Sequence, residues 1–184
     1  MLFTSLQYLI FLPLVVAVYW LCPRKFRLPL LLATSYYFYM SWMPAFILLI
    51  LGMTLFNYFW GDFLSKTSPE RKKPLFTVGL VVNLLCLCFF KYTNLLLETA
   101  AACVGIVTHH APVWHANIIL PLGISFFAFE FIHYLFEIYR GGKPIKSFVL
   151  FALFAAFFPT QIAGPIKRYK DFETQMLSDT HLKL

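Results

Sequence analysis

Three titratable side chains lie inside one long apolar stretch of the sequence. Glu130, His133 and Glu137 all fall within LPLGISFFAFEFIHYLFEIYRGG, residues 120–142. Their spacings of three and four residues put them on one face of a helix. Carboxylates and an imidazole on a shared face can hold a proton, form an ion pair or line a path for a polar substrate. We therefore predict that this face points into a site or a cavity of the protein.

A purely structural role for the same residues is the alternative. Glu130 and His133 can pair with each other and with a polar residue of a neighbouring helix such as Asn83, while Glu137 lies beside Arg140. In both cases the face points away from lipid, because an unpaired charge is costly there.

The composition places this chain in a lipid bilayer. Of its 184 residues, 60% are hydrophobic, 20% are aromatic and only 12% are charged, and the mean hydropathy is +0.74. A soluble domain of this length needs more polar residues to cover its surface. The apolar residues form long runs and do not alternate with polar ones, so the pattern favours spanning helices over a β-barrel. We predict an all-α, polytopic helical membrane protein.

Six apolar runs divide the chain. They cover residues 6–21, 28–42, 45–60, 75–90, 118–139 and 148–158; the fourth can continue to Leu97, and a looser stretch occupies 98–117. A spanning helix needs about 17 to 25 apolar residues, and the sixth run is shorter than that. We predict about five spanning helices plus a short sixth segment, spanning or re-entrant, and we favour re-entrant.

The basic residues predict the orientation. If the first five runs each cross once, three basic linkers fall on one side, and they contain Arg24, Lys25, Arg27, Lys66, Arg71, Lys72, Lys73, Arg140, Lys143 and Lys146. Cytoplasmic loops are enriched in Lys and Arg. We therefore predict a multi-pass protein of the cell inner (cytoplasmic) membrane with its N-terminus outside. No basic residue precedes run 6–21 and large residues follow it, which argues against a cleaved signal peptide.

Charge, cysteine and histidine patterns add no further site. The net charge of +7 comes from the inner linkers, where topology and anionic lipid account for it, so the predicted partner is the lipid bilayer and not nucleic acid. The four cysteines form neither a disulfide framework nor a metal pattern. His109, His110 and His115 cluster in an outer loop without a nearby carboxylate or thiolate, so no metal site is predicted.

Two stretches of the chain carry a family resemblance. LPLGISFFAFEFIHYLFEIYRGG and FFPTQIAGPIKRYKDF, residues 157–172, resemble signature stretches of the membrane-bound O-acyltransferases. The similarity is to the bacterial branch that includes alginate O-acetyltransferase and the D-alanine transfer protein of teichoic acid synthesis. The opening MLFTSLQYLIFLPLVVAVYW also looks like the start of those proteins, so residues 1–184 resemble the N-terminal part of the family's domain.

The resemblance implies an activity and its reactants. Family members transfer an acyl group, usually acetyl in this branch, from a donor on the inner side to an acceptor on the outer side through a funnel across the bilayer. The implied donor is acetyl-CoA or an acyl carrier, used as a substrate, with no bound cofactor. The implied partners are membrane or periplasmic proteins of polysaccharide modification.

The family's catalytic histidine lies downstream, in the second half of a chain more than twice this length. No histidine of this sequence occupies that place, so no catalytic residue is predicted here and the chain is expected to be inactive alone, as a truncated product or a fragment. Glu130 stands where the family pattern has Gln, and Glu137 replaces the commoner Asp. These are mild departures from the pattern.

The resemblance therefore leaves supporting roles for this chain. Glu130, His133 and Tyr134 are expected to line the funnel, with Glu137 on the same face. Lys167, Arg168 and Lys143 are expected to favour a polyanionic donor at the inner rim.

Two other hypotheses for the function remain, and neither of them is an enzyme. One is a non-catalytic membrane partner or scaffold subunit that docks through its aromatic faces. The other is a small transporter built around Glu130, His133 and Glu137. Transport is the less favoured of the two, because no internal inverted repeat is visible.

Overall fold

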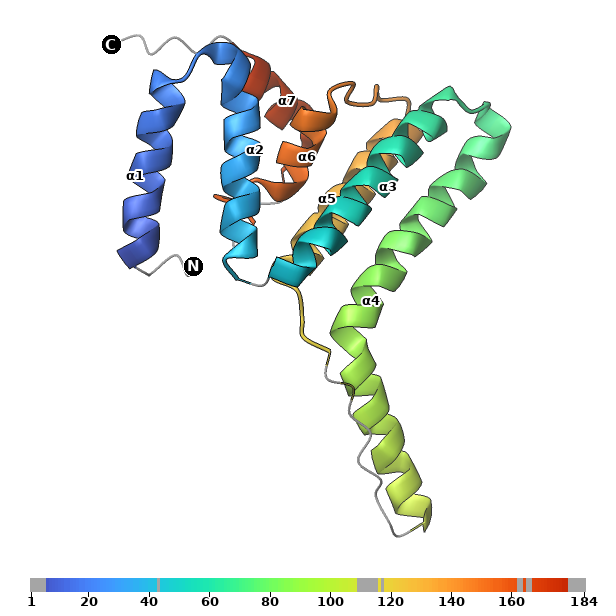
Figure 1. The fold of residues 1–184 in the computed structure, drawn as a ribbon. Helices are drawn as coiled ribbons and strands as arrows, with labels where there is room; N and C mark the ends of the chain where they lie inside the picture. Colours follow the sequence, from blue (N-terminus) through green and yellow to red (C-terminus); the bar gives the residue numbers. More distant parts are fainter. Residues whose placement is uncertain are drawn as a thin grey trace.

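A computed structural model describes residues 6–42, 44–108, 116, 118–161, 164 and 167–178. All regular secondary structure in these described ranges is helical, which confirms the predicted all-α class. The elements are α1 (Leu6–Leu21), α2 (Arg24–Met40), η1 (Pro44–Phe46), α3 (Ile47–Lys66), α4 (Pro69–Thr108), α5 (Ile124–Tyr139), α6 (Phe148–Ala156) and α7 (Tyr169–Leu177). Figure 1 shows their arrangement.

The turn between α1 and α2 is shorter than the sequence suggests. α1 ends at Leu21, as predicted from its apolar run. α2 begins at Arg24, directly after Pro23, so the basic residues form the first turn of this helix and not a linker. Pro23 fits this place because it stands just before the helix, where a missing N–H costs nothing.

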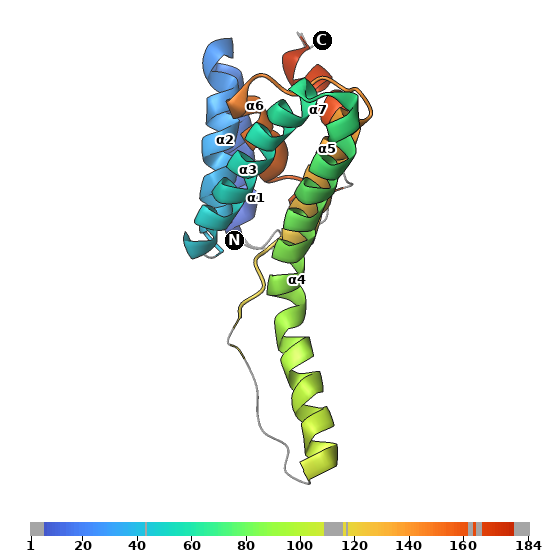
Figure 2. The ribbon, with the colours of Figure 1, turned by 90° about the vertical axis from the view of Figure 1, so that its right-hand side faces the viewer.

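α4 is a single helix of 40 residues, about 60 Å long. The predicted inner linker around Arg71 and the first part of the looser stretch, up to Thr108, both belong to it, so those two predicted boundaries are wrong. Pro69 is the first residue, where proline is tolerated, and the Ala- and Leu-rich end continues the helix because these residues have high helix propensity. Figures 1 and 2 both show the second half of α4 projecting beyond the other helices.

α5 lies at the centre of the packed helices. It begins at Ile124 and not at residue 118, because Gly123 adopts a left-handed conformation with φ 71° and starts the helix there. Phe131, Leu135 and Ile138 are fully buried. α5 packs against α3, α4 and α6, so its side chains have protein neighbours on three sides (Figures 1 and 2).

α6 has only nine residues, and the chain turns back after it. Leu150 to Ala156 are all buried, and the Oγ of Ser147 caps the helix by accepting a hydrogen bond from Leu150 N at 3.4 Å. α7 then lies beside the C-terminal end of α5, where Lys170 contacts Glu137. The chain thus leaves α5 and returns at the same end of the molecule (Figure 1). The sequence predicted the short segment but not α7.

Two helical stretches of the described chain are long and apolar enough to cross a membrane, judged by length and composition. They are Pro44–Lys66 and Pro69–Ile106; α1 is apolar but shorter. Large apolar side chains on the outer faces of the molecule are well exposed, among them Leu9 at 63% and Leu85 at 63%. Such a surface is suited to lipid or to further apolar protein.

Candidate functional site

The two sequence stretches that carry the resemblance meet in a buried ion pair. Lys167 Nζ lies 3.5 Å from Glu130 Oε1, and the two side chains are 11% and 6% exposed. Glu130 comes from the middle of α5, and Lys167 from the segment just before α7. The predicted funnel residue and the predicted donor-binding residue therefore neutralise each other inside the protein.

Lys167 has further partners that stabilise its charge. Its Nζ donates a hydrogen bond to the carbonyl of Phe154 at 2.6 Å. The rings of Phe154, Phe157 and Phe172 surround the same nitrogen, with their centroids 5.3, 5.5 and 5.4 Å away. A carboxylate, a carbonyl and three aromatic faces replace the water that this ammonium loses on burial. The Lys167 side chain is thus largely enclosed by protein, with 11% of it exposed.

His133 and Glu137 line a second polar region, about one and two helical turns after Glu130 in α5. A cavity of about 250 Å³ is bordered by His133, Glu137, Arg168, Tyr169, Lys170 and Asp171. Glu137 Oε2 accepts a hydrogen bond from Lys170 Nζ at 2.9 Å. This contact raises the pKa of the Lys170 ammonium. The shared face predicted for the three titratable residues thus faces protein on the α7 side.

The alternative pairing of Glu130, His133 and Asn83 is wrong. Glu130 pairs with Lys167, and Asn83 pairs with Asn57 of α3. His133 Nδ1 is buried without a hydrogen-bond partner among the described residues.

Tyr134 lies in the packed core. It is fully buried, and its ring centroid is 4.7 Å from that of Phe151 and 5.3 Å from that of Tyr169. Gly61 of α3 makes room for it: a Cβ at this glycine would lie 2.5 Å from Tyr134 Cε1. Here Tyr134 supports the site by joining α3, α5, α6 and α7.

Arg168 is the exposed cation between two cavities. Besides the cavity shared with His133, it borders another of about 390 Å³ together with Thr160, Lys167, Asp171 and Gln175. The next residue, Tyr169, is buried, and this burial raises the pKa of the Tyr169 phenol. The Tyr169 hydroxyl donates a hydrogen bond to the carbonyl of Lys143 at 3.1 Å. The structure therefore brings the three predicted donor-binding residues to one end of the molecule, with Lys143 and Arg168 exposed and Lys167 partly buried.

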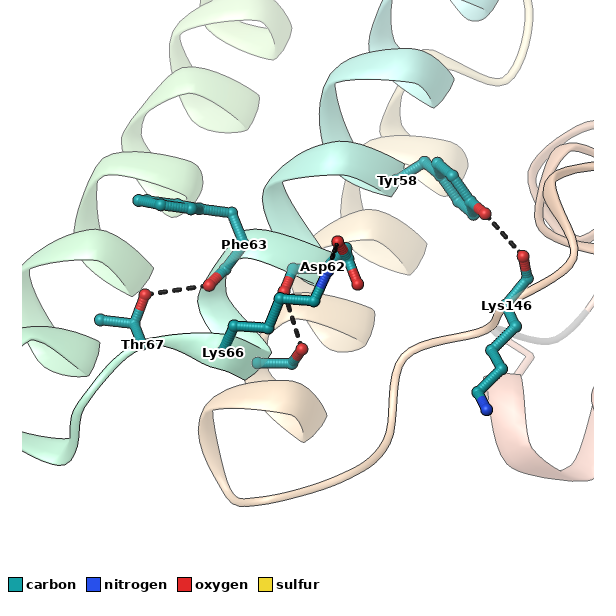
Figure 3. A network of polar contacts seen from close by, with 7 residues as sticks. Tyr58, Asp62, Phe63, Lys66, Thr67 and Lys146 are labelled. Atoms are coloured by element: carbon teal, nitrogen blue, oxygen red, sulfur yellow. Dashed lines mark hydrogen bonds and ion pairs between the residues drawn. The ribbon is translucent and has the colours of Figure 1, made fainter.

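Tyr58 of α3 contacts the connection that contains Lys143, and further polar contacts lie at the end of the same helix. The hydroxyl of Tyr58 donates to the carbonyl of Lys146 at 2.6 Å, and Lys66 pairs with Asp62 at 2.5 Å (Figure 3). Thr67 caps the same end by donating to the carbonyl of Phe63 at 2.9 Å. No local feature of the sequence marks Tyr58, because its partner Lys146 lies 88 residues further along the chain.

Among the residues that the structure describes, no group of three or more His, Cys, Asp or Glu side chains comes together. The predicted loop histidines His109, His110 and His115 lie outside the described residues.

Comparison with known proteins gives close relatives along nearly the whole chain. It is 38% identical over 98% of its length to the "probable alginate O-acetylase AlgI" of Azotobacter vinelandii, and 37% identical over 98% to the protein of the same name from Pseudomonas aeruginosa. It is 30% identical over 79% of its length to the peptidoglycan O-acetyltransferase of Helicobacter pylori. These matches confirm the predicted resemblance.

The matched regions are short relative to those proteins. They cover 37%, 35% and 32% of the three relatives, so the chain spans about a third of their length. No family model matches the chain, and no solved structure matches it significantly.

Proposed function

The chain is a homologue of the alginate O-acetylases, and from this premise we propose that it is the N-terminal part of a membrane-bound O-acyltransferase. The complete protein transfers an acetyl group from a donor on the inner side of the membrane to an exported polysaccharide. The general base of such a reaction is a histidine that removes the proton of the acceptor hydroxyl. It is expected in the part of the protein beyond these 184 residues.

The ion pair between Glu130 and Lys167 is the observation that carries this proposal. It joins the two stretches on which the resemblance rests, and it holds the segment before α7 against α5. Arg168 follows Lys167 directly and borders two cavities of about 390 and 250 Å³. We assign Arg168, with the exposed Lys143 nearby, to the binding of an anionic donor such as acetyl-CoA or an acyl carrier.

The arrangement of charges supports a membrane position for the fold. In α4, Lys73 and Lys91 bracket an apolar stretch about 27 Å long, close to the roughly 30 Å of a bilayer's hydrocarbon core. Phe90, next to Lys91, contacts Phe46, the last residue of η1 directly before α3, with ring centroids 6.0 Å apart, so α4 passes the start of α3 at this level. We place this level at the outer surface.

The opposite end is then the cytoplasmic one. Basic residues stand at the start of α2, at the end of α3 and the start of α4, in the connection after α5 and at the start of α7, and all of these lie at that end (Figure 1). This placement gives five crossings by α1 to α5, an N-terminus outside, and a re-entrant α6. It agrees with the enrichment of Lys and Arg in cytoplasmic loops.

The experiment that tests the donor site uses the complete protein with Arg168→Ala. The KM for the acyl donor is expected to rise about tenfold with kcat little changed, because a charge-assisted contact to bound donor is lost. Lys146→Ala is the matched control, since Lys146 is also basic and exposed at this end. An unchanged KM in Arg168→Ala, or an equal rise in Lys146→Ala, overturns the assignment.

A second experiment tests whether these residues belong to a longer polypeptide. An antibody against residues 66–73 is used on native membranes, where a band of more than twice the 21.4 kDa of this chain is expected. A band near 21.4 kDa contradicts the proposal and favours a non-catalytic membrane partner.

A further inference from the structure

A cleft with one polar and one apolar half runs along α1. The polar half is a cavity of about 200 Å³ where the turn between α1 and α2 meets the end of α7, and Arg24, Arg27, Gln175 and Ser178 border it. The apolar half, of about 300 Å³, is bordered by side chains of α1, including Leu12 and Val16, and by Phe157 and Phe158. Tyr19 and Met176 border both halves, so the two cavities adjoin.

The polar half has a positive potential. Two arginines border it, and the described residues that border it include no acidic one. The N-terminus of α2, where Arg24 is the first residue and the N-cap residue Pro23 makes no side-chain cap hydrogen bond, adds the positive end of a helix dipole. Arg27 is held in place, since its Nε donates to the carbonyl of Cys22 at 3.2 Å and its guanidinium lies 5.1 Å from the ring centroid of Tyr19.

The apolar half has the shape and chemistry of a site for a hydrocarbon chain. Along α1 it extends from Leu12 to Trp20, about 12 Å. Tyr19 and Trp20 stand at the level between the two halves, the place that such residues prefer at a membrane surface.

We propose that this cleft binds an anionic phospholipid of the cytoplasmic leaflet. Its phosphate lies between Arg24 and Arg27, and one acyl chain lies along α1 between Val16 and Phe158. Basic pockets between helices on the cytoplasmic side are known sites for anionic head groups, and here the apolar half continues the pocket into the bilayer. The inference rests on the membrane placement proposed above, but it does not depend on acyl transfer.

The test uses the complete, delipidated protein in detergent, titrated with phosphatidylglycerol, phosphatidylcholine or inorganic phosphate. Binding is read by native mass spectrometry and by the shift in Tm. Arg24→Gln is expected to weaken phosphatidylglycerol binding about fivefold. Lys25→Gln removes a charge from the same turn outside the cavity lining and is expected to have little effect.

A second pair of variants tests the apolar half. Val16→Phe fills the groove and is expected to weaken binding of both phospholipids, whereas Leu14→Phe enlarges a residue of α1 that is 58% exposed and does not border the groove. Leu14→Phe is expected to bind as the native protein does.

Three outcomes overturn the inference. They are equal affinity of the native protein for phosphatidylglycerol and phosphatidylcholine, an equal effect of Arg24→Gln and Lys25→Gln, and full stabilisation by inorganic phosphate alone, which would indicate a free-anion site. If the proposed acyl transfer fails instead, these titrations are unaffected, so the two failures are distinguishable.

Discussion

Lys167 and Glu130 form a buried ion pair between segments far apart in the sequence. Lys167 Nζ lies 3.5 Å from Glu130 Oε1, and both side chains are almost excluded from solvent. Three phenylalanine rings and the carbonyl of Phe154 complete the surroundings of the ammonium. Because the pair connects α5 to the segment that leads into α7, it determines where Arg168 lies relative to the two cavities.

Breaking this pair from one side is expected to be costly. Glu130→Gln or Lys167→Met alone should each lower the free energy of unfolding by about 3–5 kcal/mol, because each leaves a buried charge without its counter-ion. The double variant should lose clearly less than the sum of the two. A double-mutant cycle on Tm in detergent measures this coupling. Additive losses would contradict a direct interaction.

Part of the fold could be predicted from hydropathy alone. The end of α1 and the shortness of α6 follow from apolar runs of 16 and about a dozen residues bounded by polar or proline residues. α4 could not be delimited in this way, because charged residues in its first turns look like a linker, and its last turns are helical without being strongly apolar. The start of α5 depends on the positive φ of Gly123, and a hydropathy pattern contains no information about backbone dihedral angles.

The site could be predicted only as a face and not as a set of contacts. The spacing of Glu130, His133 and Glu137 is a local property of one helix, so the shared face was accessible from the sequence. The partners Lys167 and Lys170 are brought there by the return of the chain after α6. The return of the chain is a property of the tertiary structure and leaves no local pattern in the sequence. The pairs Glu130–Lys167 and Glu137–Lys170 could therefore not be predicted.

Gly61 and Gly52 of α3 form a natural pair of test positions. A Cβ at Gly61 would lie 2.5 Å from Tyr134 Cε1 and 2.9 Å from its hydroxyl oxygen, whereas a Cβ at Gly52 has nothing within 4 Å. Gly61→Ala is expected to destabilise by about 1–3 kcal/mol through overpacking. Gly52→Ala should be neutral or stabilise by up to about 1 kcal/mol, since Ala favours a helix interior. Equal Tm shifts would show that Tyr134 can move aside freely.

Asn57 and Asn83 join α3 to α4 through reciprocal amide hydrogen bonds of 3.0 and 2.8 Å, and both are fully buried. Asn83→Ala is expected to cost about 1–2 kcal/mol, because an interhelical hydrogen bond is lost and the Asn57 amide is left partly unpaired. Asn94→Ala is the control on the same helix, since its bond to Ile118 O is a weak one of 3.3 Å. Chemical unfolding in detergent that finds Asn94→Ala the more damaging would contradict this account.

The native cysteines test the proposed membrane orientation. Cys22 lies at the end of α1 among the basic residues, Cys103 is exposed on the projecting part of α4, and Cys88 is exposed within the stretch of α4 assigned to the hydrocarbon core. Maleimides react with the thiolate, which forms in water and not in hydrocarbon. We therefore use three variants, each of which keeps one of these cysteines. Maleimide labelling of each variant shows whether its cysteine is in contact with water.

In intact cells, a maleimide that cannot cross the membrane is expected to label Cys103 and to leave Cys22 and Cys88 unmodified. Opening the membrane should add labelling of Cys22, whereas Cys88 should react only after detergent is added. Labelling of Cys22 but not Cys103 in intact cells would reverse the orientation, and with it the side from which the donor reaches Arg168. Equal labelling of Cys88 and Cys103 in intact cells would contradict the placement of the hydrocarbon boundary at Lys91, because Cys88 lies only about one helical turn inside it.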